Sequence, residues 1–260
     1  MKLRTRDSEG SDSPLGIDTG RGVFLTAEWR DLVMLNYEAD PALLRDYVPA
    51  GVELDAFEGR TYVSLVGFRF LRTKLLGVFA VPFHTNFDEV NLRFYVRRRE
   101  GAELRRGVVF IREFVPHFAI AGLARMAYGE KYDSCPMQHG IVRTDNAISA
   151  AYEWYFEGEH FRLAAEAMGA PDYVAENTLE NFITEHYWGY SAQADGASVE
   201  YRVSHERWRI WTAAKSGFEG EAQSLYGSGF GETLRRPANS AFIAEGSPVV
   251  VHKGRPITLR

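Results

Sequence analysis

The stretch of sequence that decides the fold is Phe87-Asp88-Glu89-Val90-Asn91-Leu92-Arg93-Phe94-Tyr95-Val96. It predicts a β-strand, because apolar and polar residues alternate here and successive side chains of a strand point to opposite faces. From Val90 onward one face is apolar, as expected of a face that packs in a core, and consists of Val90, Leu92, Phe94 and Val96. The other face is polar and consists of Glu89, Asn91, Arg93 and Tyr95.

That polar face has two interpretations, and the strand alone does not choose between them. In the first it lies in water, as one face of an antiparallel sheet commonly does. In the second it lines an internal cavity. There Arg93 would offer a forked donor to a carboxylate, and Glu89 would serve as an acid, a base or an anchor.

The residues on both sides extend the strand into a β-rich fold. A turn near Glu100-Gly101-Ala102 predicts a hairpin of strands 89–99 and 104–114. Further strands are predicted at 32–38, 52–57, 60–70, 147–156, 160–167, 186–192, 198–205, 207–213 and 240–251. Short helices are predicted at 42–47, 118–128 and 176–185. Many strands with two or three short helices predict a mainly β chain of the α+β kind, folded as a barrel or a sandwich.

The composition agrees with this fold class. Of the 260 residues 45% are hydrophobic and 13% are aromatic, and aromatic side chains favour half-buried sheets. Residues 1–20 are rich in Ser, Gly, Asp and Arg and offer little apolar area, so we expect them to be a disordered, dispensable tail. No linker rich in Pro, Gly or Ser follows, so residues 21–260 are expected to form a single domain.

Charge and cysteine content exclude several classes of partner. The formal net charge of −5 gives no general attraction to nucleic acid or to anionic lipid. No stretch approaches the 18 or so apolar residues that a membrane helix needs. Cys135 is the one cysteine, so no internal disulfide forms, which is typical of a reducing compartment. We therefore expect a cytoplasmic protein with no nucleic-acid and no membrane partner.

Neither a metal nor a cofactor is predicted. The seven histidines are scattered and form no His-Glu-x-x-His pattern, so a zinc site has little support. The glycines of Gly227-Ser228-Gly229-Phe230-Gly231 lack the Lys-Ser/Thr of a nucleotide-binding loop, and we interpret them as turn glycines.

Three segments together resemble a known family, the YqjF-like bacterial proteins, also called domain of unknown function 2071. They are Glu89 to Val96, Thr184-Glu185-His186-Tyr187, and His205 three residues before Trp208. The resemblance runs from about Phe24 to about Val251. The family has no generally established reaction and is grouped by fold with acetoacetate decarboxylase, a β-rich, barrel-like structure with a closed pocket. The resemblance therefore implies an acetoacetate decarboxylase-like barrel or sandwich with an internal pocket.

Comparison with the decarboxylase suggests three catalytic candidates. Arg30 resembles its early arginine, Glu89 its pocket glutamate, and Lys131 the lysine that forms a Schiff base. The decarboxylase has a second lysine next to the first, and that neighbour helps to activate it. Tyr132 stands at the second position here and cannot supply that cation.

Three hypotheses of function follow. The first is a small-molecule pocket protein whose ligand is a carboxylate or keto compound, with a pocket lined by Glu89, Asn91, Arg93, Tyr95, Tyr187, Tyr190 and His205. The second is a Schiff-base lyase or decarboxylase that uses Lys131, Glu89 and Arg30. The third is a non-enzymatic interaction protein whose polar strand face is merely solvated. Homo-oligomer formation is left open by the sequence.

Overall fold

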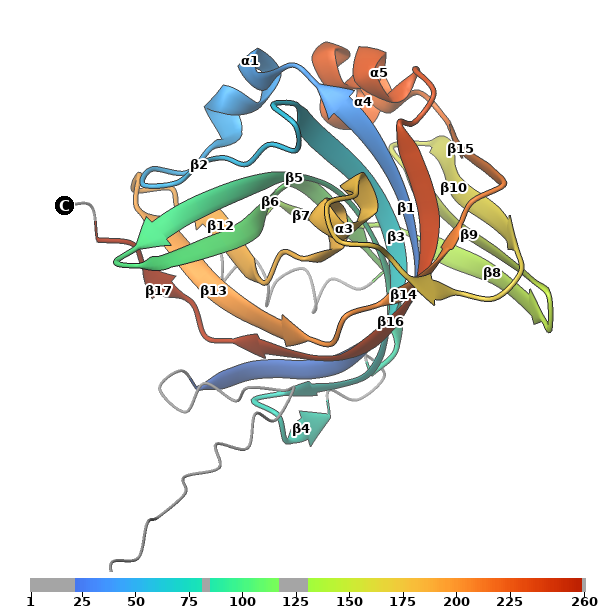
Figure 1. Cartoon of the computed structure of the whole chain (residues 1–260), viewed down its shortest axis with the longest axis horizontal. Helices are drawn as coiled ribbons and strands as arrows, with labels where there is room; N and C mark the ends of the chain where they lie inside the picture. The colour runs from blue at the N-terminus through green and yellow to red at the C-terminus, as the bar shows by residue number, and fades with distance from the viewer. Residues whose placement is uncertain (1–21, 81–84, 117–130, 259–260) are drawn as a thin grey trace, which may run out of the picture.

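A curved, 13-stranded sheet dominates the computed structural model, which describes residues 22–80, 85–116 and 131–258 (Figure 1). Its strand order is β11 (Asp172–Tyr173), β14 (Arg209–Thr212), β16 (Ser240–His252), β1 (Val23–Ala39), β3 (Thr61–Leu75), β5 (Phe87–Glu100), β6 (Glu103–Val115), β12 (Trp188–Ala192), β13 (Ser198–His205) and β17 (Arg255–Pro256). Three short strands join this path at β5, β3 and β6, respectively β2 (Glu53–Leu54), β4 (Phe79–Ala80) and β7 (Tyr132–Ser134).

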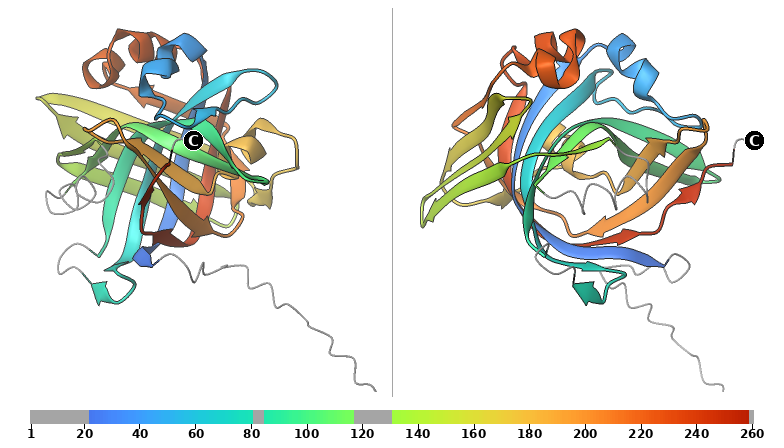
Figure 2. Two further views of the ribbon diagram at one scale, coloured as in Figure 1. Left: turned by 90° about the vertical axis from the view of Figure 1, so that its left-hand side faces the viewer. Right: turned by 180° about the vertical axis from the view of Figure 1, so that it is seen from behind.

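The sheet curls until its order returns to an earlier strand. β13 pairs with β16 in antiparallel fashion, with Val203 opposite Val251 and His205 opposite Val249. The path from β16 through β1, β3, β5, β6 and β12 to β13 therefore curls back on itself, as the two further views show (Figure 2).

A second sheet packs against the outer side of this curve. It has four strands in the order β15 (Lys215–Glu219), β10 (Glu159–Met168), β9 (Ala147–Phe156) and β8 (Met137–Thr144). β9 and β10 form a hairpin whose turn residues Glu157 and Gly158 have φ values of 51° and 85°, as the twist of a tight hairpin requires. The chain is thus mainly β and combines a curled sheet with a sandwich.

Both faces of β5 are buried as a result. Its apolar face belongs to the core between the two sheets, where Leu92 and Phe94 join Tyr152 and Trp154 of β9. Its other face turns toward the interior of the curled sheet, and a second core cluster that includes Phe68, Phe70 and Phe87 lies on this inner side. The predicted alternation is confirmed, with a buried apolar face and a polar face that is shielded from water too.

The helices are short and lie at the ends of strands. α1 (Pro41–Leu44) and the 3₁₀ helix η1 (Arg45–Tyr47) occupy the segment predicted as helical, and Asp40 caps them by accepting a hydrogen bond from the amide of Ala42 at 2.8 Å. α3 (Leu179–Thr184), which is capped by Thr178, lies within the predicted range 176–185. The predicted helix at 118–128 falls outside the described residues.

Two helices were not predicted, α4 (Ala222–Tyr226) and α5 (Ser228–Leu234). The interpretation of Gly227–Gly231 as turn glycines is wrong for two of the three, because Gly229 and Gly231 lie inside α5. Gly229 is in close contact with Leu43, and Gly231 with Gln223 of α4, so tertiary packing outweighs the low helix propensity of glycine here. Within the described ranges, no helix is long and apolar enough to cross a membrane.

Candidate functional site

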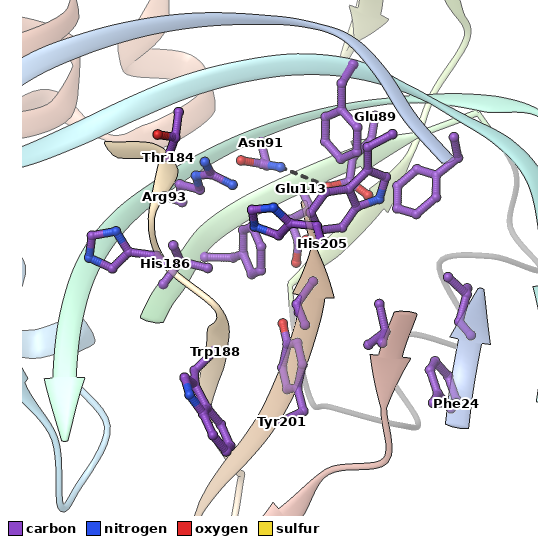
Figure 3. A pocket seen from close by; sticks show the side chains of 18 of the residues that line it. Phe24, Glu89, Asn91, Arg93, Glu113, Thr184, His186, Trp188, Tyr201 and His205 are labelled. Carbon is purple, nitrogen blue, oxygen red and sulfur yellow. Dashed lines mark hydrogen bonds between the residues drawn. The ribbon is translucent and has the colours of Figure 1, made fainter. Parts of the chain in front are cut away.

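The inner face of β5 lines a cavity of about 110 Å³ inside the curled sheet (Figure 3). Glu89, Asn91 and Arg93 all lie on its wall, and all three are buried, with exposed fractions of 3%, 1% and 8%. The remaining described residues of the lining are Phe24, Leu25, Trp29, Phe68, Phe70, Phe87, Val108, Phe110, Glu113, Tyr132, Ile183, Thr184, His186, Trp188, Tyr201, Val203, His205, Trp208 and Val251. The site is therefore an apolar, aromatic-rich enclosure with a few polar groups, the usual composition of a ligand pocket.

Glu89 is a buried carboxyl group held by neutral partners. Its Oε1 accepts a hydrogen bond from the Asn91 side-chain amide at 2.8 Å, and its Oε2 accepts one from the Tyr132 hydroxyl at 3.4 Å. Burial raises the pKa of Glu89 to about 7, although the Asn91 bond, the charge of Arg93 and the Tyr132 bond each lower it. Glu89 can therefore gain or lose a proton near neutral pH.

Arg93 brings a positive charge into the same space. The Nε of Arg93 and the Oδ1 of Asn91 are buried and have no hydrogen-bond partner within the described ranges. A buried donor or acceptor without a partner costs roughly 1–3 kcal/mol, so such groups are usually satisfied by water or ligand. The two atoms provide a donor and an acceptor two residues apart on one strand face.

His186 follows α3 and closes one end of the polar side (Figure 3). Its Nε2 lies 3.3 Å from an oxygen of Asp55, which also accepts a 2.6 Å hydrogen bond from the Nε of Arg106. Burial lowers the pKa of His186 to about 4, and the charges of Arg106 and Arg93 lower it further, although Asp55 opposes the shift. His186 is therefore neutral at physiological pH.

His205 ends β13 and is also neutral. Its Nδ1 donates to the carbonyl oxygen of Glu206 at 2.9 Å, and its ring stacks on Trp208 with 4.4 Å between ring centroids. Burial lowers the pKa of His205 to about 4, and Arg93 adds to this shift. Two uncharged imidazoles therefore lie near Arg93 in the described part of the lining.

Glu113 on β6 is a lining residue that the sequence did not reveal. It lies opposite Asn91 and is fully buried. The register between β5 and β6 shifts between Leu92 and Arg93, so that Phe110 is opposite Arg93 while Glu113, three residues later, is opposite Asn91. Both therefore share the inner face, and simple alternation along residues 104–114 cannot place them together.

Three tyrosine candidates lie outside the lining. Tyr95 is on the same strand face as Arg93, but its hydroxyl lies against Ser64 and its ring packs on Phe182 and His186. Tyr190 belongs to the core cluster on the outer side of the curl, and its hydroxyl donates to the carbonyl of Arg105.

Tyr187, the third, is half-buried and donates to Glu185 at 2.7 Å. It lies in a shallow outer hollow that also contains His205. Of the residues expected at the pocket, the structure brings together Glu89, Asn91, Arg93 and His205.

The two remaining catalytic candidates are also outside the cavity. Lys131 is exposed, and its Nζ lies 5.4 Å from the ring centroid of Tyr47 in a separate outer hollow. Its neighbour Tyr132, the first residue of β7, lines both this outer hollow and the cavity. Arg30 is bound to Glu28 at 2.9 Å and to the carbonyl of Gly246 at 3.2 Å, away from the lining.

The chain is a β-rich protein with an internal cavity, and its fold is acetoacetate decarboxylase-like. An acetoacetate decarboxylase from Legionella pneumophila superimposes with a TM-score of 0.61 at 13% identity over 98% of both chains. The enduracididine biosynthesis enzyme MppR, complexed with pyruvate, superimposes with a TM-score of 0.65 at 14% identity over 95% of both chains. Identities this low establish a shared fold and no more.

The chain belongs to the DUF2071 family, described as an uncharacterized conserved protein, which matches residues 26–248. The uncharacterized protein YqjF of Bacillus subtilis (strain 168) is 26% identical over 189 residues, which cover 71% of this chain and 74% of that protein.

Proposed function

We propose that this protein binds a small carboxylate or keto compound in the cavity beneath β5. The observation that carries the proposal is the burial of Arg93 together with Glu89 on the wall of one interior cavity. A buried charge is costly unless it is compensated, and the Arg93 Nε has no acceptor within the described residues. A carbonyl or carboxylate oxygen would supply that acceptor.

Two further features support a carbonyl-bearing ligand. Glu89 can present a protonated carboxyl near neutral pH, because burial raises its pKa to about 7, and a protonated carboxyl donates a hydrogen bond to a ketone or an acid. MppR, which has the same fold, has been crystallised with pyruvate, a compound that carries both groups.

Neither alternative hypothesis gains support. A Schiff-base reaction needs an amine inside the cavity, and Lys131 is exposed in a different hollow. A merely solvated polar face needs Glu89 and Arg93 in water, and both are buried.

Ligand-observed NMR with pyruvate and acetoacetate tests the proposal, since it detects millimolar binding. We expect both compounds to bind, and Arg93→Met to weaken binding by about tenfold or more, the usual effect of losing a charged hydrogen bond. Arg60→Met is the matched control, because Arg60 is 59% exposed and pairs with Glu38 on the surface. No binding of either compound, or equal binding to wild type and Arg93→Met, would contradict the proposal.

A further inference from the structure

We propose that the ligand is an aromatic acid of about ten non-hydrogen atoms, with its acid group at Arg93 and its ring against the aromatic side of the cavity. This inference rests on the proposed function and names the class of compound that fits the site. It follows from the position of the polar groups, the composition of the opposite wall and the size of the space.

Three of the polar groups, with Arg93 among them, lie together on one side of the cavity. In the close view Arg93, Asn91 and Thr184 lie above the space, while Trp188 and Tyr201 lie below it (Figure 3). Arg93 is the cation among the described lining residues, so an acid group has one place to bind. The remainder of the ligand must then face apolar surface.

That apolar surface is mainly aromatic. Of the 22 described lining residues ten are Phe, Tyr or Trp, and Phe110 lies beside Arg93 on the neighbouring strand β6. Aromatic rings favour edge-to-face and offset contacts with other rings, which strengthen binding between about twofold and about tenfold beyond simple burial. An aromatic ring therefore fits this wall better than an aliphatic chain.

Gly189 of β12 is part of this arrangement. It is opposite Tyr201 in the register, and a Cβ at position 189 would overlap the Tyr201 ring. The missing side chain lets the tyrosine ring lie across β12 on the floor of the cavity.

The size of the cavity limits the ligand to one ring. A buried water molecule needs roughly 10–15 Å³ of cavity, so about 110 Å³ holds roughly seven to eleven waters. A single-ring acid has a similar number of non-hydrogen atoms. Two fused or linked rings with an acid group would exceed it.

Isothermal titration at pH 6 with pyruvate and benzoylformate tests the inference, because the two differ only by a phenyl ring in place of a methyl group. We expect benzoylformate to bind at least about tenfold more tightly, from the additional apolar area that it buries. Phe110→Leu should remove much of this advantage, so that the ratio of the two affinities falls toward one. Phe79→Leu is the matched control, since Phe79 is 63% exposed and lies outside the cavity.

Each outcome separates this inference from the proposed function. Equal affinity for the two acids, or equal affinity for benzoylformate and its cyclohexyl analogue, overturns the aromatic assignment while pyruvate binding still supports the proposed function. Absence of binding by all three acids overturns both. If Phe110→Leu fails to fold in a thermal melt, Tyr201→Leu tests the opposite wall with the same expected loss.

Discussion

At the scale of single residues, Glu89 shows how burial changes the chemistry of a side chain. A carboxyl group on a solvated strand would be ionised at neutral pH, whereas Glu89 is enclosed and has a pKa of about 7. The sequence placed Glu89 on the correct strand face because alternation is a local property. It could not reveal the pKa, which depends on Asn91, Arg93 and Tyr132 meeting in space.

Replacing Glu89 with Gln should change how stability depends on pH. The folded pKa of about 7 lies above the ordinary value of 4.5. The contribution of Glu89 to the free energy of unfolding is therefore complete below pH 4.5 and is lost as pH rises through 7. Between pH 5 and 8.5 the free energy of unfolding of the wild type should therefore fall by up to about 3 kcal/mol relative to that of Glu89→Gln. Urea unfolding at both pH values measures this, with the exposed Glu232→Gln as control; parallel profiles for all three proteins would contradict it.

Lys131 leads to a second prediction at this scale. Because Lys131 is exposed outside the cavity, we expect no stable adduct after incubation with acetoacetate and borohydride. Intact-mass measurement followed by peptide mapping is the check. A mass increase that maps to Lys131 and disappears in Lys131→Ala would show that the Schiff-base hypothesis is correct.

At the scale of elements, local patterns predicted most strands, and contacts between elements decided the rest. The hairpin of β5 and β6 is confirmed, since its alternation and its turn are both local. Glu113 was missed because the register shift between β5 and β6 belongs to neither strand alone. β8 was missed because it is an edge strand of the outer sheet and most of its residues are exposed, so it has no strong pattern.

Gly246 of β16 provides a test of the strand geometry around the site. It has a φ of 76° and is opposite Arg30, and a Cβ there would overlap the carbonyl oxygen of Trp29. Gly246→Ala should cost about 2–5 kcal/mol of unfolding free energy, from the left-handed backbone and the overlap together. Gly217→Ala is the control, because nothing lies within 4 Å of its added Cβ. Equal stability of the two variants would mean that β1 and β16 can shift apart at little cost.

At the scale of the whole molecule, two sheets shield both faces of one strand. The outer sheet covers the apolar face of β5, and the curl of the larger sheet encloses the polar face. The fold class was predicted correctly because many strands, few helices and alternation suffice to indicate it. The sequence did not decide whether the polar face of β5 is enclosed. Its pattern of residues is the same whether water or a cavity lies beside that face.

Because the cavity is enclosed, several of its buried groups together determine how stability depends on pH. The pKa values of His186 and His205 are lowered to about 4 from 6.5, so their stabilising contribution is complete above pH 6.5 and is lost as pH falls through 4. Glu89 acts in the opposite direction between pH 4.5 and 7. As pH decreases below 6.5, the unfolded chain takes up two histidine protons that the folded protein does not, whereas the folded protein keeps one carboxyl proton more. The free energy of unfolding therefore decreases by about 1.4 kcal/mol per pH unit.

The free energy of unfolding should therefore be greatest near pH 6.5 and decrease on both sides. Asp55 does not affect this range, because hydrogen bonds from His186 and Arg106 outweigh its burial and lower its pKa to about 2. Urea unfolding at half-unit steps from pH 4.5 to 8.5 measures the profile. His205→Gln should reduce the slope of this profile below pH 6.5 by the equivalent of about one proton. His160→Gln should leave the slope unchanged, because the His160 side chain is 43% exposed. A profile that rises steadily toward acid pH would mean that the two histidines are protonated in the folded protein and that water reaches the cavity.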